Sequence, residues 1–280
     1  MTGTPTIARE ATGIPEETAL REAASRVTGT VDRAGHSQAL SGAAMGVRIA
    51  DVVSIDESLA DVDLAYATEV DWQQGYRLNP DSRLVLLGVK RILKRISAAG
   101  GDSNDGFDKS RTALVIGSAF GSLCSYEAFF ESVKRKRVEP LTYTYAMPST
   151  ATAAASICFQ LLGPTVTVSG EDEVGIAAVN NSVTMLAVGR CDLAIAGCWH
   201  VPSQTTRKEG LPEHAQLLVL ALQRGAAADN GLALSTWKAG ADLPFPVTGN
   251  RRSCVETLSD WIVANQQSFA NAKFMPGSQP

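Results

Sequence analysis

The pattern of apolar and polar positions is clearest in the centre of the chain. Thr165–Val168 is a short β-branched run between a Gly-Pro and a Ser-Gly pair, which predicts a buried strand. Val174–Val188 is apolar at helical spacing and is followed by Gly189, which is typical of a helix with glycine at its C′ position. Asp192–Ala196 is a second apolar strand. The order strand, helix, strand predicts a βαβ unit.

The same periodicities predict elements on both sides of this unit. We expect a strand from Met45 (MGVRIADVVSI), a helix over Leu78–Leu93 and a second helix in YEAFFESVKRKR, which ends at Arg137. Ser97–Lys109 is expected to be a loop. Ser253–Phe269 predicts an amphipathic helix, with one side formed by Val255, Leu258, Trp261, Ile262 and Asn265.

Composition divides the chain into three parts. Residues 1–42 are rich in small, polar and charged residues, which predicts a mobile N-terminal arm with a short helix around Glu16–Arg26. Residues 43–240 contain the periodic segments and are expected to form the globular domain. Residues 241–280 are expected to be a C-terminal linker, held extended by Pro244 and Pro246, followed by the amphipathic helix.

Charge and cysteine usage narrow the classes of partner. The net charge of −4 and the pI near 5.5 argue against a nucleic-acid partner. No apolar run is long enough to span a membrane, and the N-terminus lacks the pattern of a secretory signal. The five cysteines form no CxxC pair and no metal-ligand spacing, and their odd number favours a reducing cytoplasm. There is no Walker-type or dinucleotide-binding loop, so we expect neither a metal nor another cofactor.

The turn between the first strand and the helix is acidic. Such a turn directs its residues at the helix N-terminus, where a thiol would be acidified and an anion stabilised. Glu171, Asp172 and Glu173 occupy it, and none of them is a thiol or a hydroxyl. Acyl transfer by the usual covalent route is therefore not available to this turn. Glu171 and Asp172 are expected to cap the helix that starts near Glu173.

The amino-acid sequence of this segment resembles the N-terminal half of the β-ketoacyl synthases of the thiolase superfamily. There a typical stretch reads GPSLTVDTACSSGLVAL, and Asp172 falls on its acyl-accepting cysteine. Five further segments resemble that family in the same order and extend the resemblance over residues 45–237. They are LNPDSRLVLLGVKRIL (Leu78–Leu93), TALVIGSAFGSL (Thr112–Leu123), YAMPSTATAAASICFQLLGP (Tyr145–Pro164), GRCDLAIAGC (Gly189–Cys198) and HAQLLVLALQRG (His214–Gly225). The resemblance implies an α/β, thiolase-like (ketosynthase) fold, its N-terminal half only, with a mixed sheet packed between helices.

The resemblance also implies that catalytic groups are missing. The family's synthases carry two histidines in a second half, which assist decarboxylation and stabilise the developing enolate or oxyanion. This chain has His36, His200 and His214, and none lies in a matching motif. We therefore expect ordinary loop or strand-end histidines, and a chain that is not a condensing enzyme by itself.

A chain that forms only the N-terminal half of the ketosynthase fold is expected to need a partner, because it would expose a large apolar helix surface. In the resembled family the strand before the active-site turn runs beside its twin in the other subunit. The chain looks most like the chain-length factors of type II polyketide synthases, including truncated forms that accompany aryl polyene synthases, although it carries Asp172 where those often have glutamine. This implies a non-catalytic, cytoplasmic subunit that forms a heterodimer with an active ketosynthase, shapes its acyl tunnel and works with an acyl carrier protein.

Two other hypotheses remain open. One is a homodimeric protein that binds acyl chains or acyl carrier protein. The other is an independent decarboxylase or hydrolase that uses an acid of the turn as its base. A carboxylate at a helix N-terminus is stabilised as the anion, which makes it a poor base and argues against the last hypothesis.

Two sets of residues are candidates for the tunnel and the interface. In the resembled dimers Tyr143, Tyr145 and Met147 reach across to the partner's acyl pocket; the alternative is that they are core residues. The strand Thr165, Val166, Thr167 and Val168 would pair across the dimer, with the small residues of Ala151–Ser156 in the interface core. A proline at Val166 is then expected to abolish pairing.

There are two interpretations of the basic run formed by Lys134, Arg135, Lys136 and Arg137. It compensates the dipole of a solvated helix end, or it is a landing patch for an acidic carrier protein.

Overall fold

The fold is described from a computed structural model, which describes residues 45–70, 72, 78–99, 107–138, 140–226 and 252–265. Contacts divide the chain into Met1–Ala43 and Ala44–Pro280, and all the described residues belong to the second unit. The expected N-terminal arm, its helix around Glu16–Arg26, His36 and most of the expected linker lie outside the described residues.

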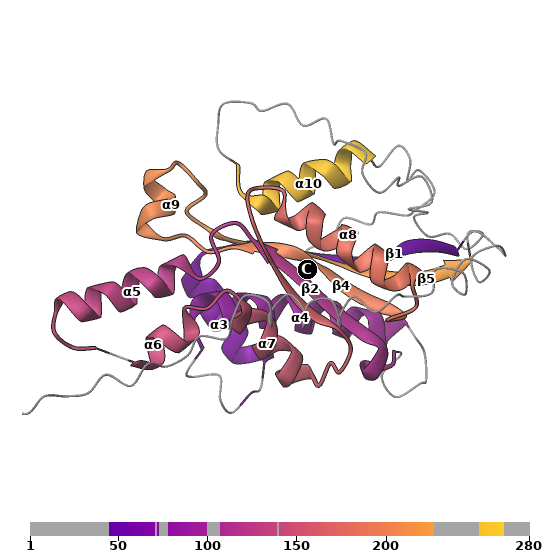
Figure 1. The fold of residues 1–280 in the computed structure, drawn as a ribbon, viewed down its shortest axis with the longest axis horizontal. Helices are drawn as coiled ribbons and strands as arrows, with labels where there is room; N and C mark the ends of the chain where they lie inside the picture. The colour runs from indigo at the N-terminus through magenta and orange to yellow at the C-terminus, as the bar shows by residue number, and fades with distance from the viewer. Residues whose placement is uncertain are drawn as a thin grey trace, which may run out of the picture. The chain divides into compact units, whose positions relative to one another are not determined.

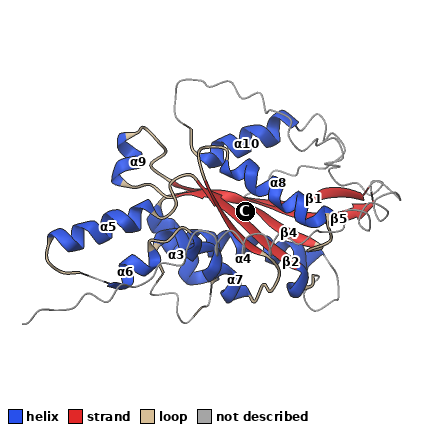
Figure 2. Ribbon diagram, viewed as in Figure 1, coloured by secondary structure: helices blue, strands red, loops and turns tan. Residues whose placement is uncertain are grey.

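Five strands form one mixed sheet in the order β1-β5-β4-β2-β3 (Figures 1 and 2). Strands β2, β3 and β4 are mutually parallel, whereas β5 runs antiparallel to both β4 and β1. The strands are β1 (Met45–Glu57), β2 (Thr112–Ser118), β3 (Thr165–Ser169), β4 (Leu193–His200) and β5 (Ala215–Ala226).

Helices cover both faces of the sheet. Figure 1 shows α3, α4 and α7 on one face and α8 and α10 on the other. The helices are α3 (Leu59–Glu69), α4 (Pro80–Ala99), α5 (Leu123–Lys134), α6 (Pro140–Tyr145), α7 (Ser149–Phe159), α8 (Val174–Ala187), α9 (Gln204–Lys208) and α10 (Cys254–Asn265), with a 3₁₀ turn η2 at Lys109–Arg111. The expected loop at Ser97–Lys109 therefore starts later, because α4 continues to Ala99. No described helix is both long and apolar enough to cross a membrane.

Each face of the sheet has its own hydrophobic core. Every residue of β2 and β4 is buried, and alternate side chains enter opposite cores. Leu114 and Ile195 join the core under α4 and α7, whereas Ala113 and Ala196 join the core under α8 and α10. This arrangement explains why both strands are continuous apolar runs rather than alternating ones.

The C-terminal helix completes the second core. The prediction of an amphipathic helix is confirmed, because one side of α10 is buried against α8 and β4. The buried side chains are Val255, Leu258, Trp261 and Ile262. The side chain of Asn265, which was assigned to the same side, lies outside the described residues.

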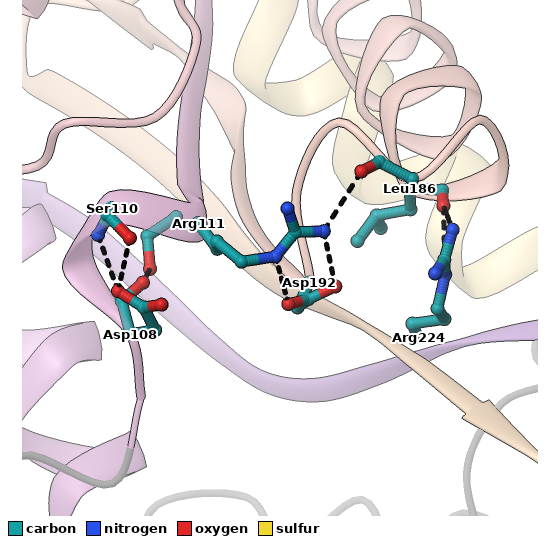
Figure 3. Close-up of polar contacts among 8 residues, drawn as sticks. Asp108, Ser110, Arg111, Leu186, Asp192 and Arg224 are labelled. Atoms are coloured by element: carbon teal, nitrogen blue, oxygen red, sulfur yellow. Dashed lines mark hydrogen bonds and ion pairs between the residues drawn. The ribbon is translucent and has the colours of Figure 1, made fainter.

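The predicted strand–helix–strand unit is confirmed as β3-α8-β4, with β2 lying between its two strands. Gly189 ends α8 with a φ of +75°, which a side chain disfavours, and an added Cβ would lie 2.9 Å from Nη2 of Arg224. Figure 3 shows Arg224 reaching the end of α8, where its guanidinium donates to the Leu186 carbonyl at 2.8 and 3.1 Å. Arg111 binds Asp192 in a bidentate ion pair, and so joins the starts of β2 and β4.

Strand β3 is an edge strand, as the resemblance implied, whereas the prediction from its apolar pattern that it is buried is wrong. Its three central residues are half-buried, while Thr165 and Ser169 are exposed. Within the described residues β3 pairs with β2 alone, so one backbone edge has no partner strand. A β-branched run predicts a strand, but its position in the sheet depends on segments elsewhere in the chain.

The ladder between β2 and β3 shows which backbone groups face the open edge. The N–H of Leu114 donates to the carbonyl of Pro164 at 2.9 Å. In a parallel ladder with that phase, the N–H of Val166 faces β2 and that of Thr167 faces outward. A proline at Val166 would therefore break the sheet of this chain itself, so Thr167 is the better test position.

The expectation for Ala151–Ser156 is also wrong in part. Ala151, Thr152, Ala154 and Ala155 are buried within this chain, where α7 packs on α4. They let the two helices approach closely inside the domain, so they are not available to an interface. Only Ala153 of this group is fully exposed.

Candidate functional site

The acidic turn joins the end of β3 to the start of α8. Glu173 is the N-cap residue of α8, and its side chain makes no capping hydrogen bond. The N–H of Val174 instead donates to the carbonyl of Glu171 at 3.2 Å. Glu171 and Glu173 are exposed, and Asp172 is half-buried. The carboxylate of Glu173 can therefore stabilise the helix start only through the helix dipole.

The end of β2 packs directly against this helix start. A Cβ on Gly117 would lie 2.8 Å from the carbonyl oxygen of Val174, so only glycine allows this approach. Gly121, in the turn that follows β2, has a φ of +54°, and its added Cβ would lie 2.9 Å from Cγ of Pro148. The carboxyl ends of β2 and β3 and the start of α7 therefore lie close to the acidic turn.

The two histidines within the described residues make ordinary contacts, as expected. His200 ends β4 and is buried, and one of its ring nitrogens lies 3.2 Å from the Pro212 carbonyl. Burial lowers the pKa of His200 below its usual value. The exposed His214 directly precedes β5 and lies 3.8 Å from a carboxylate oxygen of Asp56, near the end of β1.

The thiols are not activated. Burial raises the pKa of Cys158, Cys191 and Cys198, and it is also the largest cause of the raised pKa of Cys124. All four side chains are therefore neutral thiols at neutral pH. The described residues also contain no group of three histidine, cysteine or acidic side chains able to hold a metal ion.

The predicted tunnel residues lie on and after α6. Tyr143 is 55% exposed and Met147 is 54% exposed, so neither is a core residue. The ring of Tyr143 lies 5.2 Å from that of Phe129 on α5. Tyr145 is half-buried and packs against the main core.

Tyr145 also lines a cavity of about 360 Å³ between α4, α5 and α6. The wall is mostly apolar, and its polar groups are already engaged with one another. The side-chain amide of Asn79 donates to Oγ of Ser125 at 2.9 Å and to the carbonyl of Tyr145 at 2.8 Å. A cavity of this size and character is typical of a site for a small apolar ligand.

A buried carboxylate behind this cavity was not anticipated from the sequence. Asp81 accepts hydrogen bonds from Nε1 of Trp199 at 3.0 Å and from Sγ of Cys124 at 3.1 Å. Complete burial raises the pKa of Asp81 to about 6, although both donors act in the opposite direction. Asp81 joins α4, α5 and the end of β4, so it supports one side of the cavity. The only sequence signal was an acid in the first turn of α4, which is common in helices.

The basic run lies at the end of α5, and all four of its side chains are exposed. Lys136 has a φ of +56°. The N–H of Lys136 donates to Val133 at 2.9 Å and that of Arg137 to Ser132 at 2.9 Å, which is a Schellman motif. The structure agrees with both interpretations of the run, dipole compensation and a patch for a carrier protein, because the basic residues are exposed and lie at a helix end.

Exposed apolar side chains occur on the segments that precede β3 in the chain. Leu162, in the segment that enters β3, is 76% exposed, and Ile157 near the end of α7 is 68% exposed. The side of β3 nearer α7 is closed by a hydrogen bond from Oγ1 of Thr167 to Oγ1 of Thr152 at 2.9 Å. An uncharged edge with large apolar neighbours is typical of a strand-pairing surface.

Comparison with known proteins identifies the class to which this fold belongs. Residues 18–211 match the model of the beta-ketoacyl synthase N-terminal domain. The chain belongs to this family, and its thiolase-like architecture confirms the predicted fold class. No curated protein sequence matches the chain.

Solved ketosynthase structures are similar to the chain in fold. The ishigamide ketosynthase/chain length factor has a TM-score of 0.51 at 15% identity, over 68% of this chain and 64% of that one. The ketosynthase (ApeO) in complex with its chain length factor (ApeC) from Xenorhabdus doucetiae has a TM-score of 0.49 at 13% identity, over 66% of this chain and 81% of that one. The AntDE:AntF complex, a type II PKS acyl-carrier protein with its ketosynthase, has a TM-score of 0.48 at 15% identity, over 65% and 63% of the two chains. The chain thus spans about 64% of the length of the ishigamide protein chain.

Proposed function

We propose that this chain is a non-catalytic subunit that pairs with an active β-ketoacyl-acyl-carrier-protein synthase and shapes its acyl tunnel. The pathway class that we propose is polyketide or polyene synthesis in the cytoplasm. In this proposal residues 43–240 form the ketosynthase-like domain, and residues 241–280 supply the linker and the helix that covers one face of its sheet.

The open edge of β3 is the observation that carries the proposal. Its outward backbone groups have no partner strand among the described residues, and Leu162 and Ile157 lie exposed beside it. Pairing with a strand of another subunit would satisfy those groups and bury the apolar side chains. The resemblance to synthases that pair through this strand supports a ketosynthase as the partner.

The acidic turn supports the non-catalytic part of the proposal. Asp172 stands where the resembled synthases have their cysteine, and it is followed by a helix start that a nucleophile would use. A carboxylate there cannot accept an acyl group as a stable thioester. Chain elongation would therefore take place in the partner subunit.

The segment from Tyr143 to Met147 supports the role in the tunnel. Tyr143 and Met147 are exposed and Tyr145 lines the 360 Å³ cavity, so the segment can present aromatic surface to a partner. Tyr143, Tyr145 and Met147 would then limit how far an acyl chain extends. The exposed run Lys134–Arg137 lies at the end of α5 and would attract an acidic carrier protein.

The 360 Å³ cavity lined by Tyr145 favours a second candidate function, in which the chain forms a homodimer and itself binds acyl chains. Co-expression with a full-length ketosynthase distinguishes the two functions. We expect the ketosynthase to co-purify with the chain and to elongate acyl groups only when both are present. A chain that purifies as a soluble homodimer, binds an acyl chain and leaves ketosynthase activity unchanged would support the second candidate and overturn the first.

A further inference from the structure

A second cavity lies at the opposite end of the parallel strands from the acidic turn. Its volume is about 550 Å³, and it is formed by α4, the segment that enters β2 and the end of α7. Lys109 belongs to the turn that precedes β2, whereas the acidic turn follows the end of β3. The two sites are therefore separated by the length of the sheet.

The cavity is lined by positive charge and by apolar walls. Three lysines, Lys90, Lys94 and Lys109, contribute to its lining, and none of the described lining residues is acidic. The apolar part of the wall includes Phe107, Cys158 and Phe159. Neighbouring ammonium groups such as those of Lys90 and Lys94 repel one another unless an anion lies between them.

The lysines of α4 differ from the arginines of the same helix. Each of Arg83, Arg91 and Arg95 forms an ion pair with an acid of α3 or β1. Lys90 and Lys94 have no acid within 4.0 Å in the part of the chain that the structure describes. They stand one helical turn apart, a spacing at which like charges destabilise a helix. Among the described residues, the three arginines of α4 are therefore paired with acids, and the two lysines at the cavity are not.

The wall around Cys158 is polar as well as apolar. Burial raises the pKa of the Cys158 thiol, and the ammonium of Lys90 acts in the opposite direction, so the two groups are close. The buried hydroxyl of Tyr66 has no hydrogen-bond partner among the described residues, and its pKa responds to Cys158. A donor without a partner lies behind the same wall.

We propose that this cavity binds a soluble phosphate monoester that carries a short apolar tail. Lysine ammonium groups bind phosphate as point charges, and a dianion matches several of them better than a carboxylate does. The volume lies in the range of small-molecule sites, and the aromatic and aliphatic wall would hold the tail. The site is independent of the proposed pairing function, since it shares no residue with the edge of β3 or the acidic turn.

Calorimetric titration of the full chain with octyl phosphate, below its micelle concentration and at low salt, tests the proposal. We expect one binding site, with inorganic phosphate and octanol each binding at least about tenfold more weakly, because each provides half of the recognition. The double variant Lys90→Gln/Lys94→Gln should lose about tenfold or more in affinity with an unchanged melting temperature. The matched control Arg190→Gln/Lys208→Gln removes two exposed charges outside the cavity and should bind as the wild type does.

Each other result contradicts the proposal. Equal losses in the two double variants would show a general effect of net charge. Binding to phosphatidylcholine–phosphatidylglycerol vesicles without binding of monomeric octyl phosphate would assign the lysines to a membrane surface. No measurable heat with octyl phosphate, in protein whose melting curve is that of the folded chain, would leave the cavity without a ligand of this class.

Discussion

The two edge strands of the sheet differ in how they meet solvent. Strand β1 carries Arg48, Asp51, Asp56 and Glu57, and its register with β5 shifts between Ile49 and Asp51. Strand β3 reads TVTVS, with no charged residue and no irregularity in its register with β2. Charges and bulges are the devices by which proteins prevent edge strands from pairing.

The irregularity in β1 is supported by specific contacts. Oδ1 of Asp51 accepts the N–H of Val52 at 2.7 Å, and Nη1 of Arg95 donates to the carbonyl of Val52 at 2.8 Å. Among the described residues no comparable contact covers the outward edge of β3, and Ile157 and Leu162, which precede β3 in the chain, are exposed. The difference teaches that β1 carries features that oppose strand pairing, whereas the described β3 carries none of them. The predictions below test that contrast.

The largest effect is expected from Thr167→Pro. This change removes the outward N–H of β3, and we expect association with a ketosynthase partner to weaken by roughly 100-fold, or ~2–3 kcal/mol. Co-purification and an affinity measurement check the result. Thr167→Val keeps the N–H and should retain most of the affinity. An intact complex with the proline variant would show that β3 is not the pairing edge.

The next effect concerns the apolar flank of β3. Leu162→Lys and Ile157→Lys should each weaken pairing by about 10- to 100-fold, because each places a charge where apolar surface is buried. Val263→Lys on α10 is the matched control, since Val263 is 58% exposed and lies on the other face of the sheet. Similar losses from all three changes would mean that the flank of β3 has no special role.

Within an assembled pair, Tyr145→Ala should enlarge the 360 Å³ cavity and lengthen the product. Because Tyr145 is half-buried, the chain itself should lose about 1–2 kcal/mol of unfolding free energy. Mass spectrometry of the products measures the chain length. Unchanged product length in Tyr143→Ala, Tyr145→Ala and Met147→Ala, each in an intact complex, would argue against a tunnel role.

Asp51→Val tests the other edge of the sheet, where the charges and the register shift of β1 are expected to prevent strand pairing. This change removes a charge and the hydrogen bond to the Val52 N–H, and should cost about 1 kcal/mol. We also expect new self-association that increases with protein concentration, detected by sedimentation velocity. Binding to the ketosynthase should not change, because β1 lies at the opposite edge of the sheet.

The smallest effect is expected at the turn that follows β3. Asp172→Ala should lower the unfolding free energy by about 0.5–1 kcal/mol through the dipole of α8 and leave the activity of the pair largely intact. Chemical denaturation and an elongation assay measure the two quantities. A loss of activity of about a thousandfold, with assembly unchanged, would give the acid a role in the reaction.

Local pattern in the sequence was sufficient for most elements. The β-branched run at Thr165–Val168, the helical spacing from Val174 and the apolar side of α10 each depend on residues close in the chain, and each was predicted correctly as an element. The resemblance to the synthases supplied the fold class. Gly189 could be assigned as the end of α8, because a positive φ at a helix end strongly favours glycine.

The tertiary structure alone decided which surfaces those elements present. Periodicity shows that a side of β3 or α7 is apolar, but not which neighbour covers it. The pattern alone predicted a buried β3, which is an edge strand as the resemblance implied, and it did not show that Ala154 and Ala155 are buried inside the domain. The phase of the β2–β3 ladder made Thr167, rather than Val166, the outward donor. In the sequence Asp81 is an ordinary acid at a helix start. In the structure it is buried and accepts a hydrogen bond from Trp199, 118 residues later in the chain. Such contacts join segments that are distant in sequence, and only packing determines them.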